Sequence, residues 1–426
     1  MSGQLVNVIE DFLSKTAKRS AVHNMALALV WLTMASSGLV FSEPCPTDAL
    51  TVALVIFLPA IGLVTFTTPT AFLMMIWAGS AAFGLISATA AFEMSKAISH
   101  TLVSLYLYLA TFVLAGFVAL KPQTHTKLIL NGMTVAAAVA AAAGLIGYFD
   151  IVPGSEIFTK FGRASGTFKD PNVFGPFLVP AFLYAIHTAL ERSLKRALPP
   201  LALAGFLALG VFLSFSRGAW SNLLVALGLY IALAFVTAAS NGRRQKIAML
   251  GFCGAVLVGG VVSGALQIEK VSRLVSERAS VSQSYDVGPE GRFGGQEKAM
   301  GLILQNPLGI GAGQFALVHH HEEPHNVYLS MPLNAGWMGA GLYNAAVALT
   351  LLIGFAACMR RSPAQPLLQI AVAAFAANAF EGVIIDTDHW RHFYVLMALV
   401  WGIATSPVGE AVSGYGTWRS REAVTA

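Results

Sequence analysis

The sequence predicts an all-α polytopic membrane protein, and three observations support that fold class. The 426 residues are 56% hydrophobic and only 11% charged, and their mean hydropathy is +0.68. A soluble domain of this size usually has about a quarter of its residues as Asp, Glu, Lys and Arg. Apolar runs of roughly 20 residues, the length that crosses a bilayer, recur from one end of the chain to the other. We therefore expect one integral membrane domain, residues 1–426.

The apolar runs predict about twelve transmembrane helices. Residues 1–21 are polar and amphipathic and lack a convincing small-residue cleavage site, so the first span is expected to be an uncleaved anchor. The tenth span is long for one crossing and is expected to be tilted or broken at Gly336. The predicted spans lie near 22–41, 49–66, 70–91, 100–120, 128–148, 173–190, 198–215, 219–239, 246–266, 326–357, 366–385 and 393–408.

Lys and Arg residues predict the orientation of these spans, because short loops rich in them stay in the cytoplasm. In a twelve-span count every basic cluster falls on the same side, which predicts that both termini are cytoplasmic. The clusters comprise Lys15, Lys18 and Arg19; Lys121 and Lys127; Arg192, Lys195 and Arg196; Arg243, Arg244 and Lys246; Arg360 and Arg361; Arg419 and Arg421.

The opposite side receives the unusual polar segments of the chain. They are 149–172, the SFSRG turn at 214–218, a long loop at 267–325, and IIDTDHWRH at 384–392. No GxxxxGK[ST] string or dinucleotide fingerprint occurs in the sequence. A reaction on this side must therefore use a substrate that is already activated and already across the membrane. The three cysteines have no CxxC spacing and predict neither a disulfide framework nor a zinc knuckle.

The string HEEPH at 321–325 matches the zinc-protease pattern HExxH, in which two histidines share one helical face. Pro324 lies between these histidines, lacks an N–H and disfavours helical backbone at Glu323. We therefore interpret the run as a solvated polar segment before the tenth span rather than as a protease site. The remaining alternative is a loop metal site, because imidazole and carboxylate groups suit zinc. Its candidate ligands are His319, His320, His321, Glu322 and Glu323.

His325 and Asn326 are predicted to stand at the mouth of the tenth span, with Asn326 as the N-cap of that helix. Arg217, in SFSRG, lies in a turn so short that its charge is at membrane level. Such a charge is costly and is a functional candidate by default. The structural alternative is a snorkelling residue or an inter-helix salt bridge. Arg292 precedes a predicted short amphipathic helix near 295–305.

Two neighbouring patterns have simpler explanations. Asp170 is predicted to cap the sixth span, with Pro171 at the first helical position. The glycine-rich string GIGAG at 309–313 is only a weak indication of phosphate binding, because it follows no predicted strand.

Together these motifs resemble the bacterial O-antigen ligases and related polysaccharide polymerases, most clearly over the core 160–340. The motifs are GTFKDPNVFG at 166–175, SFSRG at 214–218, GR at 291–292 followed by NPLGIGAGQF at 306–315, and HN at 325–326 followed by GWMG at 336–339. Two positions depart from the family pattern: Ser221, where leucine is frequent, and Gln296, where an aromatic residue is expected. They affect the subfamily assignment rather than the family.

The resemblance implies a GT-C-like architecture in the bacterial inner membrane, with 267–325 as a periplasmic loop containing short helices. Such enzymes transfer a glycan from undecaprenyl diphosphate to a sugar hydroxyl. The acceptor is lipid A-core in a ligase and another lipid-linked repeat unit, of O-antigen or exopolysaccharide, in a polymerase. The resemblance assigns the diphosphate to Arg217 and Arg292 and the catalytic base to His325, with inversion at the anomeric carbon. Because the donor has its own leaving group, we expect no cofactor, no metal and no nucleic-acid partner.

Further substrate contacts are predicted around these residues. Arg163 and Lys169 add positive charge near the donor, unless they are ordinary surface residues. Asn326 adjoins the proposed base. In IIDTDHWRH a polar cluster beside Trp390 is predicted to bind sugar, and the alternative is an aromatic-belt anchor with local ion pairs. Its members are Asp386, Asp388, His389 and Arg391, of which Asp388 and Arg391 are the expected substrate contacts.

Two other classes of protein stay open from the sequence. Twelve spans suit a transporter, but a transporter should show paired interrupted helices near the midplane. We find no repeat between the two halves, and Glu381 is the main charged residue in mid-span. A structural subunit of a polysaccharide assembly complex would not need the histidine and arginine set.

Overall fold

The computed structural model describes residues 20–278 and 288–407, and in these residues the protein is built almost entirely from helices. Among the described residues, seven helices are long and apolar enough to cross a membrane, which confirms the all-α polytopic class. Each predicted span overlaps a helix, although the first helix ends at Ala35 and not near residue 41. The twelve-fold count and the cytoplasmic termini stay predictions. The long helices are Ser20–Ala35, α2 (Pro46–Ala60), α3 (Thr68–Ala88), α4 (Met94–Leu120), α5 (Pro122–Tyr148), α6 (Pro171–Glu191), α7 (Leu194–Leu213), α8 (Arg217–Val236), α9 (Asn241–Ala265), α12 (Val327–Cys358), α13 (Gln365–Glu381) and α14 (Arg391–Ala404).

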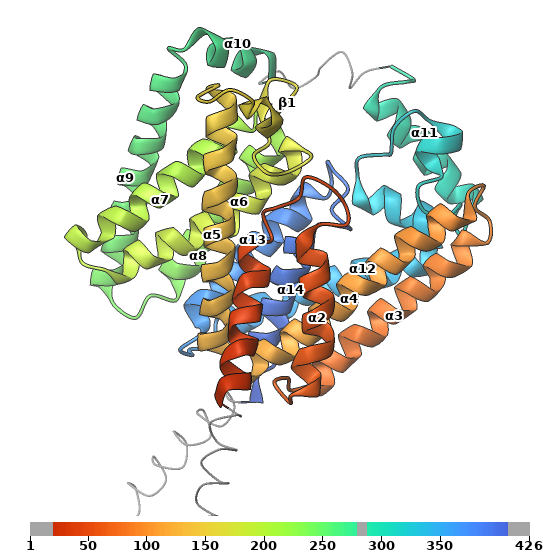
Figure 1. The fold of residues 1–426 in the computed structure, drawn as a ribbon, viewed down its shortest axis with the longest axis horizontal. Helices are drawn as coiled ribbons and strands as arrows, with labels where there is room; N and C mark the ends of the chain where they lie inside the picture. The colour runs from red at the N-terminus through yellow and green to blue at the C-terminus, as the bar shows by residue number, and fades with distance from the viewer. Residues whose placement is uncertain (1–19, 279–287, 408–426) are drawn as a thin grey trace, which may run out of the picture.

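The helices pack in two connected groups, which Figure 1 shows side by side. In one group α3 packs against α4 and α12, and α14 packs against α4. In the other group α6 packs against α5, α7 and α8, and α13 joins the groups through contacts with α8, α12 and α14. A buried aromatic cluster holds the first group together: the Trp77 and Tyr108 rings stack 4.2 Å apart, and Tyr343 and Tyr394 pack at their edges. Offset and tilted ring pairs of this kind stabilise a core beyond their buried area.

Short elements gather at one end of the bundle. They are the 3₁₀ helix η1 (Ser155–Phe158), the antiparallel strands β1 (Thr159–Lys160) and β2 (Arg163–Ala164), α10 (Glu269–Arg278), α11 (Arg292–Gln305) and the π-helical turn η2 (Phe315–His319). In Figure 1, β1, α10 and α11 lie at this end, and the first described helix begins at the other end. The described part of 267–325 therefore contains short helices, as predicted. The helix expected at 295–305 begins earlier, at Arg292, because Gly291 is the last residue with extended backbone.

Three helices begin at this end with the caps that their sequences favour. Asp170 Oδ1 accepts a hydrogen bond from the Asn172 N–H at 2.7 Å, and Pro171 occupies the first turn of α6. Asn326 Oδ1 accepts from the Tyr328 N–H at 3.0 Å at the start of α12. Both predicted caps are confirmed. Ser216 caps α8 in the same way through the Ala219 N–H, so Arg217 is the first helical residue.

Helix α12 is broken at Gly336, as its length predicted. Gly336 has φ 68° and ψ −179°, and a β-carbon there would lie 2.7 Å from the carbonyl oxygen of Pro307. The Trp337 N–H donates to that same carbonyl at 2.9 Å, which replaces a hydrogen bond lost at the break. The GIGAG string packs against this break: the Ile310 N–H donates to Leu333 O at 2.8 Å. The string is therefore a packing element of α12.

Candidate functional site

The loop between α13 and α14 is the point where the predicted site residues meet. The Arg292 guanidinium donates from Nη2 to the carbonyl oxygen of His325 at 3.1 Å and also to the carbonyl oxygen of Ile384. The N–H of Val327 donates to Gly382 O at 2.9 Å, next to the same loop. Helix α11 and the segment that contains His325 are thereby joined to the end of α13, although these residues are far apart in the sequence.

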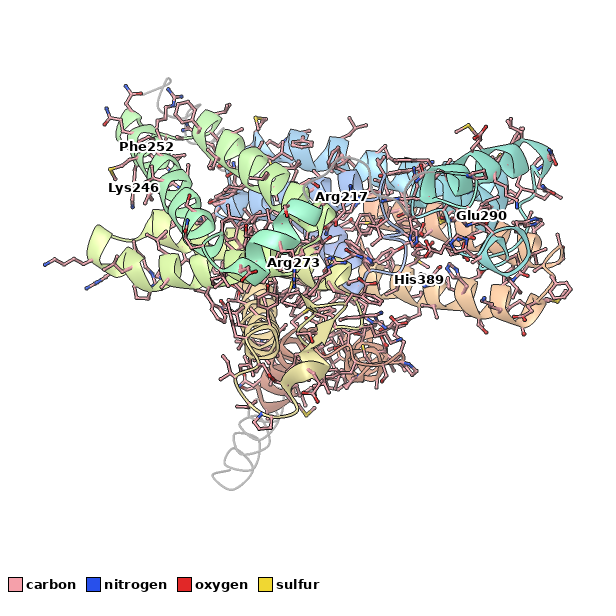
Figure 2. All side chains as sticks on the ribbon, turned by 90° about the horizontal axis from the view of Figure 1, so that it is seen from above. Arg217, Lys246, Phe252, Arg273, Glu290 and His389 are labelled. Atoms are coloured by element: carbon pink, nitrogen blue, oxygen red, sulfur yellow. The ribbon has the colours of Figure 1, made fainter. Side chains whose placement is uncertain are left out.

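The first turn of α8, which begins at Arg217, packs against the end of α13 and the same loop. The next residue, Gly218, packs so tightly that a β-carbon there would lie 2.5 Å from Glu381 Oε1. One turn further along α8, the Asn222 side-chain amide donates to Glu381 Oε2 at 2.8 Å and to Asn378 Oδ1 at 2.7 Å. Figure 2 looks onto this end of the molecule and labels Arg217 there. The beginning of α8 is therefore tied to the last turn of α13.

Backbone strain coincides with two of the predicted motifs. Among the described residues only four non-glycine residues have positive φ, and two of them are Phe215 at 46°, in SFSRG, and His325 at 51°. Left-handed backbone is costly for residues with a β-carbon, and such residues concentrate at active sites, where the surrounding structure holds them. Here the contacts of Arg292 and Val327 hold the strained segment around His325.

The side chain of His325 is half-buried and faces a carboxylate. Its Nε2 lies 3.4 Å from Glu322 Oε2. Burial lowers the pKa of His325, the positive charge of Arg292 lowers it further, and Glu322 acts in the opposite direction. The imidazole is consequently neutral near pH 7 and able to accept a proton. From the sequence, Glu322 is predicted only as a possible metal ligand, and because the segment is not helical its spacing from His325 does not predict this pairing.

The HEEPH string is not helical, as Pro324 predicted. The π-helical turn ends at His319, and no helix is assigned between His320 and Asn326. Two side chains of α11 contact the segment instead. Gln296 donates to Pro324 O at 3.1 Å, and Lys298 donates to His319 O. The protease geometry of HExxH is therefore absent from this segment.

For the predicted loop metal site, the structure brings two of the five candidate ligands together with a residue that was not predicted, Glu290. His320, His321 and Glu290 have potential ligand atoms within 4.8 Å of one another. His321 Nδ1 is 3.6 Å from Glu290 Oε2, and both side chains are more than half exposed. Glu322 and Glu323 are not part of this group.

Two basic residues predicted near the donor occupy different environments. Arg163 is buried and donates from Nε to Ser214 O and from Nη2 to Asn172 Oδ1, both at 2.7 Å. It therefore links strand β2 to the SFSRG turn and to the start of α6. Lys169 is half-exposed and forms an ion pair with Glu43 at 3.4 Å.

The IIDTDHWRH segment forms local ion pairs, which the sequence predicts as the alternative to sugar binding. Arg391 donates to both carboxylate oxygens of Asp48, at 2.6 and 2.8 Å, and lies 3.4 Å from Glu43. Asp388 is buried, and its Oδ2 is 3.4 Å from His100 Nε2. These pairings connect the segment to α2 and α4.

A neighbouring acid in this segment has an unusual pKa. Asp386 accepts a hydrogen bond from Ser330 Oγ at 2.5 Å. Burial, reinforced by the negative charge of Asp388, raises the pKa of Asp386 to about 7.

A cavity of about 460 Å³ lies beside these residues. Its walls are mixed: the polar side includes Lys169, Asp388 and Arg391, and the apolar side includes residues such as Leu114 and Phe177. A cavity of this size is within the range of small-molecule sites.

Residues 202–343 match the family model described as O-antigen ligase. The match confirms the predicted O-antigen ligase resemblance. It covers Arg217, Arg292 and His325, which the structure gathers around the α13–α14 loop. The O-antigen ligase family supports a membrane-bound, glycosyltransferase-like function in polysaccharide biosynthesis, with lipid-linked polysaccharides as the general class of substrate. No curated protein matches the chain.

Proposed function

We propose that this protein transfers a glycan from undecaprenyl diphosphate to a sugar hydroxyl of an acceptor on the periplasmic side of the bacterial inner membrane. The observation that carries the proposal is the contact between the Arg292 guanidinium and the carbonyl oxygen of His325. It supports the proposal because it joins a cation suited to a diphosphate to the backbone of a histidine whose imidazole is suited to accept a proton. Lipid A-core is the acceptor we favour, which makes the protein an O-antigen ligase.

The two arginines act on the donor. A guanidinium stays charged at all relevant pH values and offers planar, paired donors that match phosphate oxygens. Arg217 and Arg292 bind the diphosphate from α8 and α11 and stabilise the negative charge that grows on it as the bond to the anomeric carbon breaks. The first turns of both helices also contribute the positive end of a helix dipole. No step of this scheme requires a metal ion or a nucleotide.

His325 acts on the acceptor. Its neutral imidazole removes the proton of the attacking hydroxyl while the oxygen forms a bond to the anomeric carbon. The lipid diphosphate leaves from the opposite face, so the reaction inverts the configuration. Glu322 stabilises the imidazolium that forms, because its carboxylate lies 3.4 Å from Nε2. General-base help of this kind contributes about 10²–10⁴-fold to a rate.

The sugars are bound near the 460 Å³ cavity. Asp388, Arg391 and Lys169 line its wall and offer hydrogen bonds to hydroxyl groups, and Arg163 and Asn326 support the segments on either side. The alternative function is polymerisation of lipid-linked O-antigen or exopolysaccharide repeat units, which uses the same donor chemistry and which the family match supports equally. Transport has no comparable support.

The test is deletion of the gene followed by profiling of surface glycans. A ligase predicts loss of polysaccharide from lipopolysaccharide, with lipid-linked polymer accumulating in the cell. A polymerase predicts single repeat units in place of long chains. Complementation with wild type, but not with His325→Ala, is expected to restore the profile. Unchanged glycans in the deletion strain would refute both readings.

A further inference from the structure

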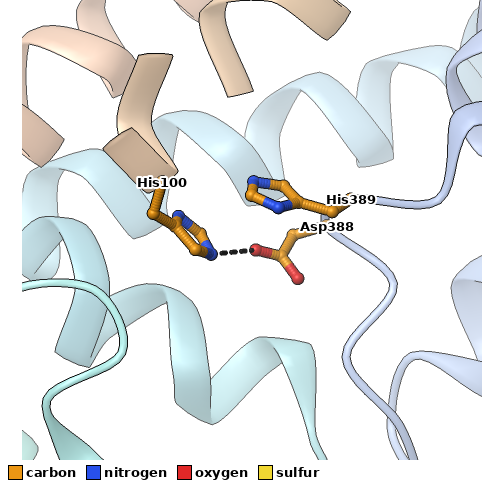
Figure 3. Close-up of side chains that lie close together, drawn as sticks. All are labelled: His100, Asp388 and His389. Atoms are coloured by element: carbon orange, nitrogen blue, oxygen red, sulfur yellow. Dashed lines mark ion pairs between the residues drawn. The ribbon is translucent and has the colours of Figure 1, made fainter. Parts of the chain in front are cut away.

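A second cluster of polar side chains, none of them Arg217, Arg292 or His325, lies where the α13–α14 loop meets α4. It consists of His100 on α4 and of Asp388 and His389 in the loop (Figure 3). One potential ligand atom from each residue lies within 4.8 Å of the other two. We propose that His100, Asp388 and His389 bind a divalent transition-metal ion, for which Zn²⁺ is the natural candidate, and that this ion clamps the loop to α4.

The distances fit this ion. Zinc binds imidazole nitrogen and carboxylate oxygen at about 2.0–2.2 Å in tetrahedral geometry, so two of its ligand atoms lie about 3.3–3.5 Å apart. His100 Nε2 and Asp388 Oδ2 are 3.4 Å apart. The two imidazole rings stack with centroids 4.0 Å apart and planes 29° apart, and the potential ligand atoms of the three residues lie within 4.8 Å of one another. Binding therefore requires the His389 ring to turn until its lone pair points at the ion. Two imidazoles and one carboxylate leave the fourth position open, and Asp388 and His389 both face the cavity.

Hydrogen bonds prepare His389 for this role. The hydroxyl of Ser104 donates to the carbonyl oxygen of His100 at 3.2 Å. Its oxygen lies 2.9 Å from His389 Nε2, and with its own proton on that carbonyl it can accept the Nε2–H. In that tautomer the lone pair of the His389 ring is on Nδ1 and is available to a metal ion. A metal-binding histidine almost always donates its other N–H to such a partner.

The surroundings keep the ligands in place and leave a path for the ion. The hydroxyl of Tyr394 donates to the backbone carbonyl of Asp388 at 2.7 Å, which fixes the loop from α14. His100 and Ser104 are one turn apart on α4 and so share a face. The Asp388 side chain is 9% exposed and that of His100 is 29% exposed, so the ion can enter on the histidine side.

The test uses full-length protein purified in detergent with an affinity tag that contains no histidine. The protein is stripped with a chelator, and Zn²⁺ binding is measured by competition with a chromogenic chelator and by metal content. We expect one Zn²⁺ per chain at this site and a melting temperature that rises with Zn²⁺. His100→Ala and His389→Ala are expected to abolish both effects. Ser104→Ala keeps every ligand and is expected to weaken binding about 10–100-fold.

The control is the double variant His320→Ala, His321→Ala, which removes the other histidine cluster and should leave binding at this site unchanged. If stripped wild type binds no Zn²⁺, or if only the double variant loses it, the proposal is wrong. If a ligand variant does not fold, the Ser104→Ala variant provides the test: weaker Zn²⁺ binding supports the proposal, and unchanged binding contradicts it. Zinc binding is measured without a glycan substrate, so its outcome is independent of the proposed transferase activity.

Discussion

Replacing His325 with alanine is expected to stop glycan transfer while leaving donor binding nearly intact. The magnitude follows from the site. The pKa of His325 is below its ordinary value because of burial and the charge of Arg292, so the unprotonated imidazole predominates near pH 7. The whole benefit of a general base, about 10²–10⁴-fold in kcat, is therefore lost in the variant. The diphosphate contacts come from Arg217 and Arg292, which remain.

The assay measures transfer from a purified lipid-linked glycan to an acceptor, in parallel with donor binding. His321→Ala is the matched control, because its exposed side chain lies in the same segment and faces Glu290 instead of the arginines. We expect its rate to stay near that of wild type. A His325→Ala protein that inserts and expresses normally, yet transfers at the wild-type rate, would refute the catalytic role and leave the histidine as a polar residue before α12.

The pH dependence of the wild-type enzyme provides a second, independent readout of the same group. A base acts in its unprotonated form, so the rate should be level at neutral pH and fall only as the pH drops through the folded pKa of His325. Because that pKa is lowered, the midpoint should lie below 6.5. A midpoint above that value would contradict the environment described for the imidazole.

The remaining predictions concern the donor site, the break in α12 and the topology. Arg217→Ala and Arg292→Ala should weaken donor binding as well as turnover. Arg292→Lys should restore neither fully, because lysine lacks the paired donors of a guanidinium. Unchanged donor affinity would argue against the assignment of these arginines to the diphosphate. Gly336→Ala should destabilise the protein by about 1–3 kcal/mol, because Gly336 has positive φ and a β-carbon there would be too close to Pro307. Gly341→Ala in the same helix is the control: a β-carbon there would contact no atom outside its own helix, and the change should not destabilise the protein. Thermal unfolding measures both. Reporter fusions after residues 126, 195, 244 and 361 should be cytoplasmic, and fusions within 150–170 or 270–320 should be periplasmic. A cytoplasmic result for 270–320 would overturn the proposed location of the reaction.

Features that depend on a few neighbouring residues were predictable from the sequence. The apolar runs coincide with helices because a bilayer requires about 20 apolar residues and internally satisfied backbone groups. The caps at Asp170 and Asn326 depend on side chains two residues from their partners. The break at Gly336 and the non-helical HEEPH segment follow from the backbone preferences of glycine and proline.

Only the tertiary structure decided which distant residues meet. Arg292 and Ile384 are 92 residues apart in the chain, and Arg391 and Asp48 are 343 apart. The same segment, IIDTDHWRH, supplies an ion pair to α2, a carbonyl to Arg292 and two side chains beside His100, and no local pattern distinguishes these roles. They depend on how α4, α8, α11 and α13 pack against one another. That packing arises from many weak contacts between helix faces, which the spacing of residues along one helix does not encode.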